Sequence, residues 1–361
     1  MTSPYTIAIA NVPWFGPKSN AVMFEYFSDP KDAWNASADE LIAAKIRPQD
    51  VPKFLKFRTE HDPQEFVDIM EKHGIRAVTI ADDEYPEMLK TIHTPPTLLF
   101  VKGTLPSTAK KHLAMVGSRH ATQYGLRVAK KLAFDCANAG IVVVSGLAYG
   151  IDEACHRGAL DANGITLAVL GSGILGVDNT RHFELSDAIV DGGGAVISEF
   201  QFTMAPLAHN FPIRNRIVAG MCHGTLAIEA GVPSGTLLTT TSATSENREV
   251  FAVPGMIDSA MSKGTNELLK HGAHVVTEAR DIFEVLGMNV APSASATAFL
   301  PIGRSPDEIA LFAEFGAVPV HIDTAIEKAK LTTSAASVAL TGLELLGFIE
   351  DVGGKQFVRK T

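Results

Sequence analysis

The sequence has few cysteines and none of the patterns that mark a membrane or secreted protein. Its three cysteines, Cys136, Cys155 and Cys222, show no C-x-x-C spacing, and one would be left over from any disulfide pairing. Free thiols in a reducing compartment fit this pattern best. The chain has no apolar run of about eighteen residues and no basic start leading into an apolar segment, so we expect no membrane partner. The prediction is a soluble cytoplasmic protein.

The sequence also lacks the short motifs of several enzyme classes. It contains no G-x-x-x-x-G-K-[ST] loop, no H-E-x-x-H, no Cys/His metal cluster and no G-x-S-x-G. His209, His223 and His271 have no partner carboxylates at a ligand spacing. We therefore predict no metal, no cofactor and no catalytic residue, and we expect a protein that is not an enzyme.

Positive charge is scarce. The 361 residues include 31 Lys and Arg against 40 Asp and Glu, for a net charge of -9 and an isoelectric point near 5.7. Because non-specific DNA affinity comes mostly from cation–phosphate contacts, this balance excludes a generally basic coat, and any DNA site must be a local groove. The length and the 46% apolar share indicate two or three well-packed domains.

Residues 1–80 consist of short amphipathic segments, such as 20–27 and 63–73, broken by prolines, and they predict a small helical domain of the SAM or helix-hairpin-helix type. Residues 12–18 are similar to the hairpin of a helix-hairpin-helix module, in which a glycine turn aims backbone N–H groups at a phosphate. Trp14 occupies the place of that hairpin's first glycine. A DNA-contacting hairpin and a purely structural helix cluster therefore both stay open.

Residues 81–287 form the predicted central domain. From Lys111 onward, short β-branched runs alternate with longer helical stretches. Apolar strands with intervening helices are typical of a parallel sheet covered on both faces, which predicts an α/β fold. Because ligands of open α/β sheets bind at the carboxyl ends of the strands, we expect one ligand-binding edge there. The predicted strands are 112–116, 141–144, 165–170, 195–198, 224–228, 250–253 and 274–276.

Residues 288–301 are small and uncharged, and they predict a linker between domains. Beyond it, in the predicted domain 302–361, the segments 305–315, 322–329 and 333–346 read as helices and are followed by a hairpin around Gly353-Gly354. Three helices and such a hairpin predict a winged-helix domain. Its third helix carries no Lys or Arg, which favours protein contact or a structural role over reading of duplex DNA.

Several turns carry residue types that suit a polyphosphate bearing bases. Gly117-Ser118-Arg119 and Ser145-Gly146 each follow a predicted strand, where backbone N–H groups and an arginine fork can hold a phosphate. Ser234-Gly235 make a further amide- and hydroxyl-rich turn, and Lys263 supplies another candidate cation. The alternative for each turn is an ordinary helix cap or an exposed side chain.

The segment 211–216 places a ring just ahead of two guanidinium groups. Phe211 offers a platform on which a base can stack, and Arg214 and Arg216 can grip phosphate or shape the site. The alternative for Phe211 is a loop aromatic packed on the core.

The segment 171–176 matches G-x-G-x-x-G after a predicted strand, and Glu199 ends the next strand where a dinucleotide fold places its ribose-binding acid. However, residues 177–180 delay the following helix, so that its start does not face a pyrophosphate. We therefore do not predict NAD binding.

Taken in order and spacing, these motifs resemble the DNA-processing protein A (DprA/Smf) family. The resemblance covers nearly the whole chain and rests on residues 83–86, 99–103, 116–119, 145–152, 156–160, 198–199, 210–220, 234–236, 250–255 and 264–266. It implies an extended Rossmann-like fold for the central domain, binding of single-stranded DNA, protection of incoming strands and loading of the RecA recombinase during natural transformation. It also implies a homodimer, whose self-contact we would seek near residues 266–271.

A competing hypothesis is a nucleotide-processing enzyme of the lysine-decarboxylase-like superfamily, which uses a glycine-rich loop and a glutamate on nucleoside monophosphates. Glu229 near Ser234-Gly235-Thr236 is similar to that pattern, although here the acid lies upstream of the loop. A third hypothesis is an architectural recombination adaptor, which would need no cations in a groove.

Overall fold

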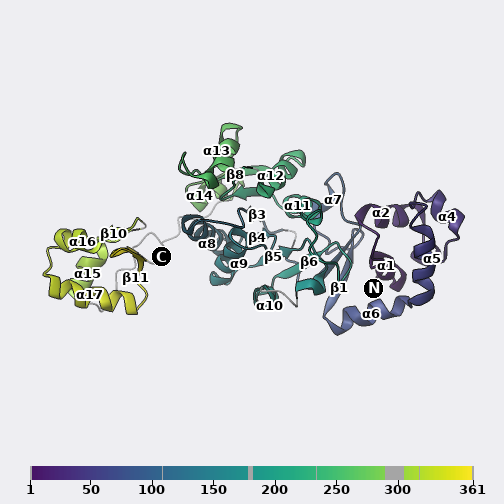
Figure 1. The fold of residues 1–361 in the computed structure, drawn as a ribbon, viewed down its shortest axis with the longest axis horizontal. Coiled ribbons are helices and arrows are strands. Elements are labelled where there is room, and N and C mark those ends of the chain that lie inside the picture. Colours follow the sequence, from purple (N-terminus) through teal and green to yellow (C-terminus); the bar gives the residue numbers. More distant parts are fainter. Residues whose placement is uncertain are drawn as a thin grey trace. The chain divides into compact units, whose positions relative to one another are not determined.

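The structure is a computed structural model that describes residues 2–107, 109–177, 182–232, 234–288, 305–316 and 318–359 (Figure 1). It divides into two compact units, residues 1–289 and 290–361, each of which is considered by itself. The predicted linker lies outside the described residues except for Met288, as do residues 178–181 and Pro233.

Within the described residues, the first unit is built on a nine-stranded sheet with the order β1-β2-β6-β5-β4-β3-β7-β8-β9. Strands β3 to β9 are parallel, which confirms the predicted α/β fold, and β1 and β2 are antiparallel additions at one edge that the sequence analysis did not predict. The strands are β1 (Ile75–Thr79), β2 (Leu98–Gly103), β3 (His112–Val116), β4 (Val142–Ser145), β5 (Thr166–Val169), β6 (Ala195–Ser198), β7 (Gly224–Ala227), β8 (Glu249–Ala252) and β9 (His274–Val275).

Helices cover both faces of the sheet because alternate side chains of each central strand point to opposite sides. In β3, Leu113 and Met115 join the core under α8 and α9, whereas Ala114 and Val116 join the core under α11. The helices of this part are α7 (Glu87–Lys90), α8 (Gln123–Asn138), α9 (Ile151–Asp161), α10 (Phe183–Asp191), α11 (Asn210–Gly220), α12 (Gly235–Ser245), α13 (Lys263–Lys270) and α14 (Ala279–Val285), with short 3-10 turns η1 (Ile174–Val177) and η2 (Ala260–Ser262).

The strand order reverses direction at β3. From β3 the chain proceeds through β4, β5 and β6 toward one edge of the sheet, and then through β7, β8 and β9 toward the other. At such a switch point the connections leave the sheet on opposite sides, and a crevice opens at the carboxyl ends of the strands. The predicted ligand-binding edge is therefore centred on β3, β4 and β7.

Six short helices precede the sheet, as predicted, and several begin with a proline. Pro17, Pro30 and Pro63 each stand in the first turn of a helix, where the missing N–H costs nothing. Three of the prolines that divide this region thus start helices. The helices are α1 (Pro4–Ala10), α2 (Pro17–Tyr26), α3 (Pro30–Asn35), α4 (Ala38–Ala43), α5 (Val51–Glu60) and α6 (Pro63–Lys72).

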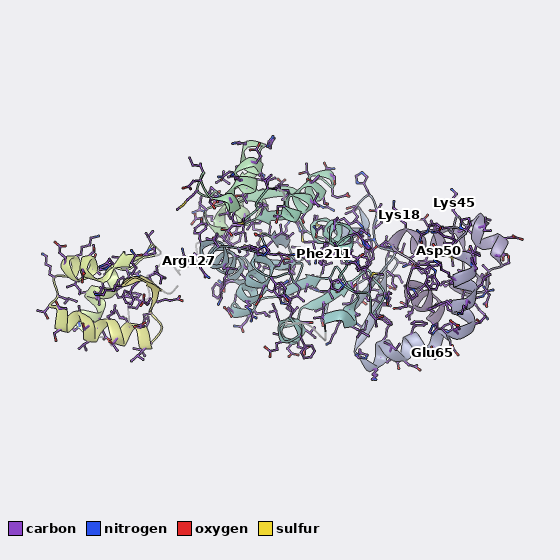
Figure 2. All side chains as sticks on the ribbon, in the orientation of Figure 1. Lys18, Lys45, Asp50, Glu65, Arg127 and Phe211 are labelled. Atoms are coloured by element: carbon purple, nitrogen blue, oxygen red, sulfur yellow. The ribbon has the colours of Figure 1, made fainter. Side chains whose placement is uncertain are left out.

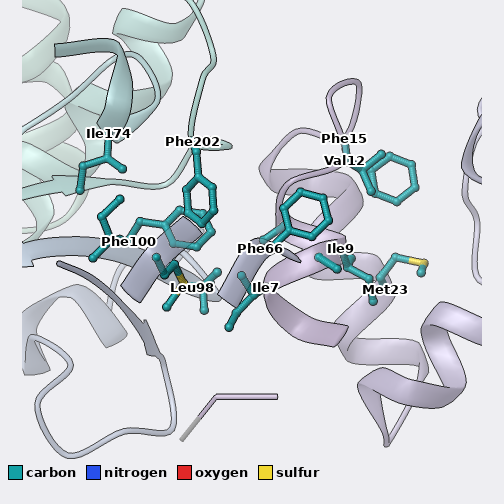
Figure 3. Packing of buried hydrophobic residues seen from close by; sticks show 14 of the residues in the cluster. Ile7, Ile9, Val12, Phe15, Met23, Phe66, Leu98, Phe100, Ile174 and Phe202 are labelled. Atoms are coloured by element: carbon teal, nitrogen blue, oxygen red, sulfur yellow. The ribbon is translucent and has the colours of Figure 1, made fainter. Parts of the chain in front are cut away.

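The six helices share one hydrophobic core with the flank of the sheet. Ile7 and Phe66 belong to the same buried cluster as Phe100 of β2 and Phe202 (Figure 3). The backbone N–H of Phe202 also donates to the side-chain oxygen of Asn11 at 2.9 Å. Although residue 80 was the expected domain boundary, strand β1 lies before it and pairs with β2 in the sheet. Helices and sheet therefore form a single compact unit.

The second unit has the predicted winged-helix architecture. It contains α15 (Pro306–Ala313), α16 (Ile322–Ala329), α17 (Thr333–Leu345) and a three-stranded sheet of β10 (Val320–His321), β12 (Gln356–Arg359) and β11 (Ile349–Gly353). Leu311, Phe312 and Leu343 form its core. Over the described parts of both units, every helix is too short or too polar to span a membrane.

Candidate functional site

A cavity of about 420 Å³ opens at the switch point of the sheet. Its walls come from the turns after β3 and β4, the segment between β7 and α12, one side of α11, the first turns of α9 and α12, and η2. Most of the predicted site residues meet here. The lining residues are Val116, Gly117, Ser118, Arg119, His120, Gly146, Ala148, Asp152, Phe211, Arg214, Asn215, Val218, Gly231, Ser234, Gly235, Thr236, Thr239 and Met261.

Three helices begin at this edge of the sheet. Helices α8, α9 and α12 follow strands β3, β4 and β7, and their N-cap residues are Thr122, Gly150 and Ser234 respectively. The Ser234 hydroxyl caps its helix by accepting the Thr236 N–H at 3.1 Å. Because the amino end of a helix carries a partial positive charge, the edge favours an anion.

An arginine lies over the ring of Phe211. The Arg119 guanidinium carbon is 4.4 Å from the centre of that ring, a distance typical of a cation–π contact. Arg119 is exposed, Phe211 is half-buried, and both line the cavity. No acidic side chain within the described residues forms an ion pair with Arg119. The site therefore presents one unneutralised cation beside one aromatic ring.

Arg214 is a structural fork beneath that ring. It is 4% exposed and donates to the backbone carbonyls of Gly146 (2.7 Å) and Val169, at the ends of β4 and β5. Gly146 is required here, because a Cβ at this position would collide with the guanidinium group. Burial lowers the pKa of Arg214 to about 10, an effect that Asp152 opposes. Arg214 thus holds the strand ends together. Of the two roles predicted for it, gripping phosphate or shaping the site, this contact corresponds to shaping the site.

Asp152 provides the opposite charge to Arg214. It is buried in the first turn of α9 and accepts the Gly146 N–H at 3.1 Å. Burial raises the pKa of its carboxyl, and Arg214 acts against that rise. The Gly146 amide is consequently engaged within the protein, so Gly146 shapes the cavity wall and donates to Asp152.

Arg216 does not line the cavity. It lies within 2.5 and 2.6 Å of the two carboxylate oxygens of Glu199, and both side chains are largely buried. Burial raises the pKa of the Glu199 carboxyl, and Arg216 opposes the rise. The positive charge of Arg216 is therefore neutralised by Glu199. Because Glu199 is paired in this way, it is not available to bind a ribose.

Two other predicted residues also lie outside the cavity lining. The hydroxyl of Ser145 is buried and donates to the Met115 carbonyl at 2.6 Å. Lys263 is exposed at the start of α13, two residues after Met261, which does line the cavity. His120 and Asn215 also line the cavity, and the sequence analysis did not select them. In the sequence, only their positions next to Arg119 and Arg214 could have indicated that they belong to the site.

The G-x-G-x-x-G segment has a packing role in this structure. It leads into η1, and α10 starts only at Phe183, so the expected delay of the helix is present. Gly171 lies against Phe211, with only 2.8 Å between an added Cβ and the ring. The segment therefore supports the cavity wall from behind.

Glu229 also serves the fold. It is 3% exposed, and its carboxylate accepts the Thr122 N–H at 2.9 Å and the Thr122 hydroxyl at 2.6 Å. It does not line the cavity. The glutamate that would serve a nucleotide-cleaving enzyme is thus occupied at the start of α8.

The cavity combines an α/β switch point, three helix amino ends, an exposed arginine and an aromatic ring. This arrangement is typical of α/β proteins whose ligands carry phosphate. Comparison with known proteins narrows this class. Residues 76–287 match the family described as DNA recombination-mediator protein A, and residues 292–355 match the DprA winged helix domain. The chain belongs to this DprA/Smf family, as its motifs predicted.

Similar proteins and structures agree. Protein Smf of Escherichia coli K12 is 39% identical, over 76% of this chain and 75% of its own length. The X-ray structure of DprA from Streptococcus pneumoniae has a TM-score of 0.66 at 32% identity and covers 78% of this chain and 98% of its own. DprA from Helicobacter pylori, at 24% identity and a TM-score of 0.51, covers 58% of this chain and 95% of its own and shares the fold.

Proposed function

We propose that this chain binds single-stranded DNA in the switch-point cavity and delivers it to a recombinase. The observation that carries the proposal is the exposed Arg119 lying over Phe211 at the shared edge of three helix starts. A stacking ring tolerates every base, and the cation and helix ends attract the phosphates. Phe211 is labelled in Figure 2, in the sheet part of the first unit.

Membership of the family also supports a role in binding single-stranded DNA for recombination. The matched family is described as a recombination mediator, and the structural study of the Helicobacter pylori neighbour describes a single-stranded DNA binding mode of that protein. We therefore propose protection of incoming strands and loading of RecA during natural transformation as the role of this binding. We also propose a homodimer and a cytoplasmic location, the latter consistent with three buried, unpaired cysteines.

The test is a fluorescence-anisotropy titration with a labelled dT oligomer. Wild-type protein should bind, and Phe211→Ala should bind about 5- to 150-fold more weakly, since base stacking is worth roughly 1–3 kcal/mol. Phe134→Ala is a matched control, because Phe134 is an exposed phenylalanine on α8 outside the cavity. Failure of the wild-type protein to bind dT would refute the proposal. RecA loading is checked by following RecA assembly on the same strand with and without this protein.

A further inference from the structure

An exposed tyrosine directly follows Ala148, a residue of the cavity wall. Tyr149 is 45% exposed. Its ring centre lies 4.5 Å from the ring centre of His182, with 39° between the planes. A tyrosine side chain that packs against a histidine ring and still exposes almost half of its surface can contact another flat group.

The turn that carries Tyr149 is firmly held. Leu147 is buried and adopts a left-handed backbone conformation, φ 53°, and Gly150 has φ 80°. For a residue with a side chain this conformation costs about 1 kcal/mol or more and persists only where the surroundings impose it. The Gly146 N–H bonded to Asp152 fixes the start of the turn. Tyr149 is therefore presented by a defined backbone.

The same turn lies against the Arg119 segment. A Cβ on Gly150 would collide with the carbonyl of Ser118 and would lie 3.0 Å from that of Arg119, and the Ile151 N–H donates to the Ser118 carbonyl at 3.2 Å. Ala148, the residue on the other side of Tyr149, lines the cavity. Since consecutive Cα atoms are about 3.8 Å apart, Tyr149 stands at the boundary between the cavity wall and the surface.

We propose that Tyr149 is a second stacking platform, which holds the base next to the one bound over Phe211. This inference rests on the proposed function, because it extends the path of a single strand out of the cavity and across its rim. The strand keeps its phosphates near Arg119 and the helix starts, while two successive bases meet two rings. Stacking of this kind adds affinity without sequence preference.

The experiment separates rings from charges. Wild type, Tyr149→Ala and Tyr149→Phe are titrated with a dT oligomer and with a fully abasic oligomer of equal length, which keeps the phosphates and lacks the bases. We expect Tyr149→Ala to bind dT about 5- to 150-fold more weakly and to match wild type on the abasic strand. Tyr149→Phe should match wild type on both. Tyr26→Ala, which removes a 53%-exposed tyrosine on α2, is the control and should change neither.

Each other outcome overturns the inference. Equal dT binding by wild type and Tyr149→Ala would show that the ring holds no base. An equal loss on both strands would show that Tyr149 only shapes the phosphate site, and a loss in Tyr149→Phe would assign the effect to the hydroxyl. If wild type failed to bind dT, the proposed function itself would fall. A Tyr149→Trp variant gives an independent reading, because its fluorescence should be quenched by dT and unchanged by the abasic strand.

Discussion

Two arginines that the sequence analysis assigned to the site differ in their surroundings. Arg119 is exposed over Phe211, whereas Arg216 is buried against Glu199. For single strands, the logarithm of the binding constant falls with the logarithm of salt concentration by about 0.7 per phosphate contact. Arg119→Ala should therefore lower the salt slope by about 0.7. Arg216→Ala should leave the slope unchanged, because its charge is already neutralised.

Stability should show the opposite ranking: Arg216→Ala should be strongly destabilised, and Arg119→Ala only slightly. Arg216→Ala leaves the Glu199 carboxylate buried without its partner, at a cost of about 3–5 kcal/mol in the free energy of unfolding. Replacing both residues with methionine removes both charges and should restore most of the loss. Arg119→Ala removes an exposed cation–π contact, which is worth about 0.5–1 kcal/mol.

The measurements are dT titrations between roughly 50 and 200 mM salt, together with urea unfolding of each variant. Over that fourfold range, wild type should lose about 2.6-fold more affinity than Arg119→Ala. If Arg216→Ala reduced the slope as much as Arg119→Ala does, Arg216 would touch phosphate, and the assignment of its charge to Glu199 would be refuted.

Two further substitutions probe the support beneath the cavity. Gly146→Ala places a methyl group against the Arg214 guanidinium and should cost about 1–3 kcal/mol in urea unfolding and weaken dT binding; unchanged stability would contradict the close approach. Burial, with His182 and Arg214 nearby, lowers the pKa of His156 to about 3. The unfolded chain therefore takes up the proton first, and about 2 kcal/mol of stability is lost between pH 7 and pH 5. His156→Asn, whose amide can still donate to Thr166, should remove this part of the pH dependence, and equal pH profiles would refute it.

The order of strands and helices was predictable because the central strands are buried on both faces. Unbroken apolar runs such as 142–144, each followed by glycine or serine and then a helical segment, leave little choice but a parallel sheet. Strands β1 and β2 escaped prediction. They pair antiparallel at the sheet edge, and β1 directly follows α6, so that neither shows the alternation of strand and long helix.

The cavity edge was also predictable from the sequence, but the roles of its arginines were not. Arg214 and Arg216 are separated by one residue, yet one bonds to Gly146, 68 residues away, and the other to Glu199, 17 residues away. The neighbouring sequence does not distinguish an arginine that is open to a ligand from one that is already paired with a carboxylate. Only the folded arrangement shows that Arg216 is paired with Glu199, whereas Arg119 is exposed at the cavity.

The hydrophobic core that the first six helices share with the sheet limits how the chain can be shortened. Phe100 and Phe202 are buried in a cluster completed by Ile7 and Phe66. In a version of the protein without residues 1–72, these two rings would be exposed to water. The exposed apolar surface beside β1 would then favour aggregation. Removing the N-terminal helices without loss of solubility would therefore require polar residues in place of Phe100 and Phe202 on the sheet flank that the helices cover.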